Sequence, residues 1–406
     1  MRAACTVVLG FCAMAAKKPA GNTQFPAREI LAQLRARERS MLQLLGEFVR
    51  SESFSYDKKA VDRFGAMVAR EWKRRGAAVR VFKNKDRGNN LRIELHATAA
   101  KSQGRILVLG HLDTVYRMGT ISKTPFRVSA GRAWGPGTFD MKGGIALALY
   151  AVDALRALRI PVRKNLVFLW TSDEEIGSAA SRATIESEAR KSYAVLVLEP
   201  AFGAEGKLKT QRKGVGGVDL VVTGKSAHAG IDPEKGVNAV HELALQIECL
   251  MRLNDRKRGI TVQTTVIEGG TVSNVVPEAA RAEVDIRFTH LADGDRLQRK
   301  IHSLKSALKG ASLQITGGVN RPPLERTPAV AALFAKAQAL SAEMGLKLGE
   351  ASTGGGSDGN FTAAIGVPTL DGLGCVGDGA HSPHEHVVIR ALPERAALIA
   401  GLLATL

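Results

Sequence analysis

The sequence contains little cysteine, and the four cysteines of this 406-residue chain include no Cys-x-x-Cys pair. Cys5 and Cys12 lie in the first stretch, whereas Cys249 and Cys375 stand far apart. This spacing argues against a disulfide framework and against a thiolate zinc site. Cys249 falls inside the helical pattern of residues 243–253, so we expect it to be a small core side chain.

Aromatic residues are also scarce, at 5% of the chain, and lysine and arginine are scattered along it. No zinc-finger spacing and no mixed aromatic and basic stretch is present, which argues against nucleic acid as a partner. After residue 16 no run approaches the roughly 20 apolar residues of a membrane span. The 57 basic and 39 acidic residues give a net charge of +18, which suits anionic partners without selecting one. We interpret it as a solvated basic surface.

The first 16 residues have the pattern of an exported leader. Arg2 precedes an apolar stretch of about fourteen residues, and the polar run Lys17-Lys18-Pro19 follows it. This order predicts a signal peptide over residues 1–16 and favours a periplasmic or secreted location over a cytoplasmic one. A misassigned start or a disordered tail is the alternative.

Three predicted strands end in side chains that could bind a metal ion. The strands are expected at residues 103–110, 166–170 and 194–198. The side chains that follow them are His111, the adjacent pair Glu174 and Glu175, and Glu199. Ligands bind outside the carboxyl ends of the strands in an open α/β sheet, so these residues are candidates for chemistry. The two glutamates could equally open a helix, where carboxylates favour the positive end of the dipole.

The alternating α/β pattern is interrupted between residues 214 and 324. There the predicted order is strand, helix, two strands, helix and strand, which is the ferredoxin-like arrangement. After Arg326 the first pattern resumes. We therefore predict one α/β domain over residues 17–213 and 325–406, with residues 214–324 inserted as a separate α+β domain.

A metal site without thiolates must use carboxylates and imidazoles, and such a donor set suits Zn²⁺. Two zinc ions about 3.5 to 4 Å apart can polarise a carbonyl group and activate a bridging water. Each candidate alone has another explanation, such as a helix cap or a turn residue, but their joint placement favours a metal site. The candidate ligands are His111, Asp140, Glu175, Glu199 and one of His381, His384 and His386.

The motifs around these residues resemble those of the dinuclear zinc aminoacylase and carboxypeptidase family. That family includes acetylornithine deacetylase, succinyl-diaminopimelate desuccinylase and the glutamate carboxypeptidases. The matching stretches are Gly-His-Leu-Asp-Thr-Val at 110–115, Gly-Pro-Gly-Thr-Phe-Asp-Met-Lys-Gly-Gly at 135–144, Asp-Glu-Glu-Ile-Gly-Ser at 173–178 and Glu199-Pro200. The resemblance implies an α/β zinc exopeptidase catalytic domain with an inserted ferredoxin-like dimerisation domain.

The resemblance also implies two zinc ions per subunit. Asp140 would bridge the ions, with His111 and Glu199 on one and Glu175 and His381 on the other. These assignments come from the family pattern.

Further roles follow from the same resemblance. His381 is preferred to His384 and His386 because residues 380–387 match the family's last motif, Ala-His-Ser-x-x-Glu-x-Val. Asp113 would orient the histidine ligand two positions before it. Glu174 would be the general base that takes a proton from the attacking water.

The inserted domain also carries motif residues. His228, in the stretch Gly-Lys-Ser-Ala-His-Ala-Gly, resembles the family histidine that reaches the active site of a partner subunit, which implies a homodimer. A loop histidine that bonds only locally is the alternative. Asn274 and Arg287 match positions that reach substrate, and Gly355 lies in a glycine-rich loop where backbone can approach a ligand.

Within the family, the chain most resembles glutamate carboxypeptidases of the carboxypeptidase G type. Lys207 and Arg321 fall where that subgroup contacts the substrate carboxylate, and a guanidinium can hold a carboxylate bidentately. The chain departs from the subgroup over residues 209–217, where Gln211-Arg212-Lys213 adds bulk and charge near the pocket.

These features predict a zinc-dependent exopeptidase that releases a C-terminal amino acid, glutamate being expected, from peptidyl or N-acyl substrates. The alternative within the same fold is a deacylase of small N-acyl amino acids. A third hypothesis is a non-catalytic protein that keeps the fold and binds metal.

Overall fold

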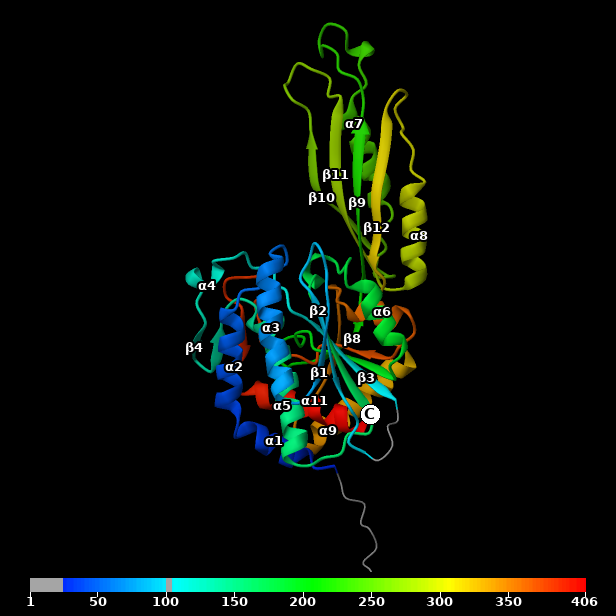
Figure 1. Ribbon diagram of the computed structural model, residues 1–406. Helices are drawn as coiled ribbons and strands as arrows, with labels where there is room; N and C mark the ends of the chain where they lie inside the picture. The colour runs from blue at the N-terminus through cyan, green and yellow to red at the C-terminus, as the bar shows by residue number, and fades with distance from the viewer. Residues whose placement is uncertain (1–24, 100–103) are drawn as a thin grey trace, which may run out of the picture.

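The computed structural model describes residues 25–99 and 104–406, so the predicted signal peptide lies outside the described residues. Its largest sheet has the strand order β1-β2-β6-β3-β7-β14 (Figure 1). β3, β6, β7 and β14 run parallel, whereas β2 is antiparallel to β6 and β1 is antiparallel to β2. The strands are β1 (Ala78–Phe82), β2 (Asn90–Leu95), β3 (Arg105–His111), β6 (Asn165–Thr171), β7 (Ala194–Val197) and β14 (Thr369–Leu370).

Helices cover both faces of this sheet, as the side chains of β3 show. Ile106 and Val108 join a core with α1, α2, α3, α5, α9 and α11, whereas Leu107 and Leu109 face α6 and α10. A strand buried on both faces needs a continuous apolar run, which is what these four residues provide. The helices are α1 (Ala27–Arg35), α2 (Glu38–Arg50), α3 (Lys58–Arg74), α5 (Gly143–Ala157), α6 (Arg182–Arg190), α9 (Pro328–Glu343), α10 (Gly359–Ala364) and α11 (Ala391–Thr405).

A second sheet, of the order β10-β11-β9-β12, is antiparallel throughout. Side chains of β9 alternate between buried and exposed because α7 and α8 cover one face of this sheet. Figure 1 shows it standing away from the six-stranded sheet. Its elements are β9 (Gly214–Thr223), α7 (Ala239–Met251), β10 (Thr261–Gly269), β11 (Ala279–Phe288), α8 (Leu291–His302) and β12 (Ser312–Arg321). This is the ferredoxin-like order that the sequence predicts, while the exact domain boundaries stay a prediction.

Two smaller strand assemblies, which the sequence patterns do not predict, carry parts of the site. β8 (Leu208–Arg212) pairs in parallel with β13 (Glu350–Thr353) and ends at Arg212. The loop that holds His381 connects two strands of a small sheet. That sheet has the order β15 (Gly377–Asp378), β16 (His386–Val388), β5 (Arg132–Trp134) and β4 (Arg127–Ser129). The remaining helical segments are short: α4 (Thr120–Lys123), η1 (Thr138–Lys142), η2 (Glu174–Ile176) and η3 (Pro233–Lys235).

The expectation that Cys249 belongs to the core is wrong. Cys249 is exposed on α7, whereas Cys375 is buried. Successive helix residues point about 100° apart, so the neighbouring Leu250 faces the core and Cys249 does not. None of the helices in the described residues is long and apolar enough to cross a membrane.

Candidate metal centre

The carboxyl ends of three neighbouring strands bring the site together. β3 pairs with both β6 and β7, so His111 at the end of β3 lies beside Thr171 at the end of β6. The turn with Glu174 and Glu175 follows β6, and Glu199 follows β7. The parallel strands therefore deliver these side chains to one edge of the sheet.

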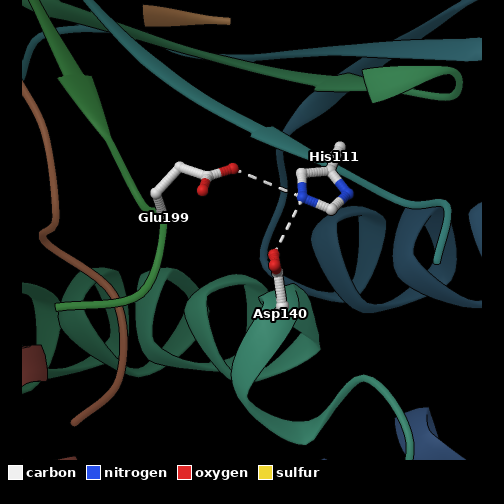
Figure 2. Close-up of side chains that lie close together, drawn as sticks. All are labelled: His111, Asp140 and Glu199. Atoms are coloured by element: carbon white, nitrogen blue, oxygen red, sulfur yellow. Dashed lines mark hydrogen bonds and ion pairs between the residues drawn. The ribbon is translucent and has the colours of Figure 1, made fainter. Parts of the chain in front are cut away.

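His111, Asp140 and Glu199 form the first group of candidate metal ligands, and Figure 2 shows both carboxylates directed at one ring nitrogen. His111 Nε2 lies 3.2 Å from Asp140 Oδ1 and 3.3 Å from Glu199 Oε1. All three ligand atoms lie within 4.8 Å of one another. Zinc binds such nitrogen and oxygen atoms at about 2.0 to 2.2 Å, so this spacing suits a shared ion.

Asp140, Glu175 and His381 form the second group. His381 Nε2 lies 3.0 Å from Glu175 Oε2 and 3.4 Å from Asp140 Oδ2. Asp140 therefore presents one carboxylate oxygen to each group, as a ligand shared by two ions must. His381 adopts a left-handed φ of 64°, and non-glycine residues in that region occur often at functional sites. His384 and His386 belong to neither group.

The buried carboxylate of Glu385 holds the loop that carries Asp140. Its Oε1 accepts the backbone N–H groups of Phe139 at 2.7 Å and Asp140 at 2.9 Å. Its Oε2 accepts the N–H of Gly137 at 3.0 Å and the hydroxyl of Tyr116 at 2.5 Å. Because Glu385 directly precedes β16, it ties the shared ligand to the loop of the second group.

Asp113 connects the histidine ligand to the turn of the two glutamates. His111 Nδ1 donates to the carbonyl oxygen of Asp113 at 2.9 Å, which leaves Nε2 of a neutral ring free to bind a metal. The carboxylate of Asp113 is farther away, with Oδ1 at 3.5 Å from Nδ1. It accepts the N–H groups of Glu174 and Glu175, both at 3.2 Å, and the Ser55 hydroxyl at 2.8 Å. Asp113 thus orients His111 through its backbone and fixes the turn through its side chain.

Burial and converging negative charge shift the ionisation of this cluster. Burial, reinforced by Asp140, raises the pKa of Glu175 to about 7. Burial alone would lower the pKa of His111, but hydrogen bonds to the surrounding carboxylates raise it well above its usual value. Hydrogen bonds to Asp140 and Glu175 raise the pKa of His381 to about 11. The raised pKa values mean that these three side chains bind protons strongly, and a divalent cation could replace those protons.

One carboxylate oxygen of the cluster has no partner among the described residues. Glu175 Oε1 is buried without a hydrogen bond, and the whole side chain is only 4% exposed. A buried acceptor without a donor destabilises a fold by about 1 to 3 kcal/mol, and by more when it is charged. A bound metal ion would remove this cost by coordinating the oxygen. Carboxylates and imidazoles without thiolates suit zinc and several other divalent ions. The residues present therefore fit a pair of such ions.

Glu174 lies beside the cluster without belonging to either group. Its Oε1 forms an ion pair with Arg321 Nη2 at 3.0 Å, and the same nitrogen donates to the Glu174 carbonyl oxygen at 2.9 Å. Burial raises the pKa of Glu174 well above its usual value; Arg321 opposes this shift and Glu199 adds to it. A carboxylate with a raised pKa binds a proton more strongly than an ordinary carboxylate, which suits a general base.

Several residues predicted to contact substrate gather around the glycine-rich loop near Gly355. Arg287 Nη1 donates to the Gly354 carbonyl oxygen at 3.2 Å. Arg321 Nη1 donates to Asp358 Oδ1 at 2.8 Å, so its guanidinium already bonds to protein groups on both sides. Substrate contact by these residues stays a prediction.

Three other predicted site residues have no ion pair with a candidate ligand among the described residues. Lys207 instead pairs with Glu205 at 2.7 Å. His228 and Asn274 lie in the loops after β9 and β10, where Ala229 N–H donates to the Asn274 carbonyl oxygen at 2.9 Å. Those loops are at the end of the second sheet farthest from the six-stranded sheet (Figure 1).

Two charged residues of the site, Arg212 and Asp371, are not among the predicted site residues, although the family resemblance places Arg212 near the pocket. Arg212 Nη2 lies 3.3 Å from Glu199 Oε2, and Arg212 Nε lies 2.8 Å from Asp371 Oδ2. Asp371 directly follows β14, so the strand-end rule that identifies Glu199 could have found it. Arg212 is the last residue of β8, and its burial could not be predicted because an arginine in a short strand is usually on the surface.

Comparison with known protein families identifies the family of this chain. Residues 107–405 match peptidase family M20/M25/M40, and this range contains every candidate ligand. The chain belongs to this family. The match confirms the predicted family resemblance and identifies an M20 metallohydrolase.

Similar proteins agree with the M20 assignment. Carboxypeptidase G2 of Pseudomonas sp. (strain RS-16) is 31% identical over 370 residues, which cover 90% of this chain and 88% of that protein. Succinyl-diaminopimelate desuccinylase of Dechloromonas aromatica (strain RCB) is 30% identical over 321 residues, covering 72% and 81%. The solved structure of aminopeptidase PepT from Bacillus cereus ATCC 10987 has a TM-score of 0.77 at 23% identity, covering 90% of this chain and 98% of that one. The predicted fold class is confirmed.

Proposed function

We propose that this M20 protein is a two-zinc carboxypeptidase that releases a C-terminal amino acid, glutamate being expected, from small peptides or N-acyl amino acids. The observation that carries the proposal is that two ligand groups share Asp140 and have Glu174 beside them. The similarity to carboxypeptidase G2 supports the carboxypeptidase reaction.

Each of the two ligand groups would hold one ion. His111, Asp140 and Glu199 would hold one ion, and Asp140, Glu175 and His381 the other. When bound, the ions would polarise the scissile carbonyl group and lower the pKa of the attacking water.

Glu174 would move the proton in this reaction. Arg321 occupies Oε1 of Glu174, so Oε2 is the oxygen that would accept a proton from the attacking water. The same atom would then deliver that proton to the nitrogen of the leaving amine. The ion pair would keep the carboxylate in one orientation while the proton moves.

The main alternative is hydrolysis of small N-acyl amino acids. The Lys207 ammonium group pairs with Glu205, so the residue predicted to hold a C-terminal carboxylate already has an acidic partner. Similarity to a succinyl-diaminopimelate desuccinylase supports the same alternative. A panel that varies the acyl group and the released amino acid separately distinguishes the two reactions.

We also propose that the active form is a homodimer. His228 and Asn274 lie at the far end of the second sheet, so they would act on the ligand cluster of a partner subunit. A periplasmic or secreted location remains a further proposal, which rests on residues 1–16 alone.

The experiment that tests the proposed function is Glu174→Gln in the zinc-loaded protein. We expect two bound zinc ions and a fall in kcat on N-acyl glutamates of about 10²- to 10⁴-fold, the usual contribution of a general base. Glu268→Gln is the matched control, because Glu268 is an exposed carboxylate that pairs with Arg281 on the second sheet. Wild-type turnover in Glu174→Gln with both ions bound would show that Glu174 is not the base.

A further inference from the structure

Every N–H group of the Arg212 guanidinium has an acceptor. Nε and Nη2 donate to the two carboxylate oxygens of Asp371 at 2.8 and 2.9 Å, and Nη2 also donates to Glu199 Oε2 at 3.3 Å. Nη1 donates to the carbonyl oxygens of Gly355 and Gly356 at 3.1 and 3.0 Å. A guanidinium has five N–H groups, so none remains for a substrate.

The charge of Arg212 is balanced inside the fold. Arg212 is 3% exposed and Asp371 is fully buried, and the Ser357 hydroxyl donates to Asp371 Oδ2 at 2.6 Å. Burial alone would lower the pKa of Arg212, but attraction to Asp371 and Glu199 raises it, so the guanidinium stays charged. Asp371 is thus the main counter-charge of Arg212, at 2.8 Å, and Glu199 is the more distant partner at 3.3 Å.

The contact with Arg212 fixes which way the Glu199 carboxylate faces. Oε2 is held by Arg212, and Oε1 lies 3.3 Å from His111 Nε2 in the first ligand group. The terminal torsion of a glutamate is broad, so without a partner on Oε2 this carboxylate could rotate away from the group. Among the described residues, Arg212 has no hydrogen bond or ion pair with Glu175 or His381 of the second group.

We propose that Arg212, held by Asp371, is a positioning residue for the first ion alone: it aims Glu199 at the ion that His111 and Asp140 would share. The other edge of the same guanidinium holds the glycine-rich loop through its carbonyl oxygens. The inference rests on the two-metal centre proposed above, and its test reads out metal binding.

The test uses the double variant Arg212→Met/Asp371→Asn. Removing one partner of a buried ion pair leaves an unpaired charge, whereas replacing both charges is often neutral for stability. The double variant should therefore fold with a thermal midpoint near that of the wild type in the metal-free form. The matched control is Arg326→Met/Glu350→Gln, because Arg326 and Glu350 form an exposed ion pair with two contacts of 2.8 Å at the start of β13.

The measurement is a zinc titration in competition with a chromophoric chelator. We expect the wild type and the control to bind two equivalents, and the double variant to bind one equivalent as tightly as the wild type. Its other equivalent should bind about 10- to 100-fold more weakly, the usual effect of losing a group that orients a metal ligand. Two equivalents with wild-type affinity, or two equally weakened, would overturn the assignment of Arg212. Fewer than two equivalents in the wild type would instead overturn the two-metal centre, and this inference with it.

Arg212→Lys, with Asp371 intact, separates positioning from general support of the fold. A lysine keeps the positive charge, but its ammonium group cannot reproduce the planar guanidinium that donates to Asp371, Glu199 and the glycine-rich loop together. We expect it to weaken the same single equivalent and to leave the metal-free thermal midpoint within a few degrees of the wild type. A lowered midpoint with both equivalents weakened would mean that Arg212 only supports the fold.

Discussion

Replacing Lys209 by methionine should stabilise the protein, and the gain should depend on pH in one direction. Lys209 lies in β8 and is only 8% exposed, and no hydrogen bond or ion pair of its ammonium group is found among the described residues. Burial, reinforced by the nearby Arg212, lowers the pKa of Lys209 from 10.5 to about 8. Methionine fills a similar volume without a charge.

The size of the effect follows from this shift in pKa. One pKa unit corresponds to about 1.4 kcal/mol, so a fall from 10.5 to about 8 means that the charged lysine destabilises the fold by about 3 kcal/mol at pH 7. Between pH 8 and 10.5 the unfolded chain binds more protons at this residue than the folded chain. The free energy of unfolding of the wild type therefore rises with pH in this window, and its difference from that of the variant becomes smaller.

The assay is urea unfolding of the metal-free protein at pH 7 and at pH 9.5. We expect Lys209→Met to raise the free energy of unfolding by about 2 to 3 kcal/mol at pH 7 and by about 1 kcal/mol at pH 9.5. Lys347→Met is the control, because Lys347 is exposed just before β13, which pairs with β8, and it should change stability by less than about 0.5 kcal/mol. An unchanged stability at pH 7, or a gain that is equal at both pH values, would show that the Lys209 ammonium is hydrated or paired.

Two further predictions concern the metal ions and the partner subunit. Zinc affinity should fall as pH drops from 8 to 6, because Glu175 has a pKa of about 7 without metal and must release its proton to bind zinc. Isothermal titration with zinc at both pH values measures the two affinities. Equal affinities would contradict the prediction. If His228 acts across a dimer, an equal mixture of His228→Ala and Glu174→Gln subunits should recover about a quarter of wild-type activity, since half the dimers would have one complete site. No recovery, or a monomer in light scattering, would rule out this role.

The candidate ligands at the strand ends could be predicted from sequence because they depend on local signals, whereas Asp140 and His381 are assigned through the family resemblance. An apolar run that ends in an acid or a histidine is visible along the chain, and parallel strands bring such ends to one edge. The pairing of β3 with β6 and β7 places His111 and the two glutamates together as this rule requires. The same rule says nothing about which side chains face each other across the site.

The supporting contacts could not be predicted, because each depends on segments that are distant in sequence. Arg212 meets Asp371 across 159 positions, through the arrangement of β8 and the chain after β14. Glu385 appears in a recognised motif, yet its four hydrogen bonds form only when its loop meets the loop of Asp140. The pair of Lys207 with Glu205 is likewise not visible in the motif, and substrate contact by Lys207 stays a prediction.

The two ligand groups differ in how firmly they are held, and this difference predicts the order of metal loading. In the first group His111 is 1% exposed and bonded through Nδ1, and Glu199 is held by Arg212. In the second group His381 is 52% exposed, and no hydrogen bond of its Nδ1 is found among the described residues.

Less conformational freedom is lost when an ion binds to side chains that are already fixed, so the first group should fill first. In a zinc titration, His381→Ala should therefore lose the weaker of two equivalents and Glu199→Ala the tighter one. His384→Ala is the control for the second group, because His384 is exposed three residues from His381 and belongs to neither group. Loss of the tighter equivalent in His381→Ala would show that exposure and fixed contacts do not set the order, and that the charge of Glu175, with its unpaired oxygen, does.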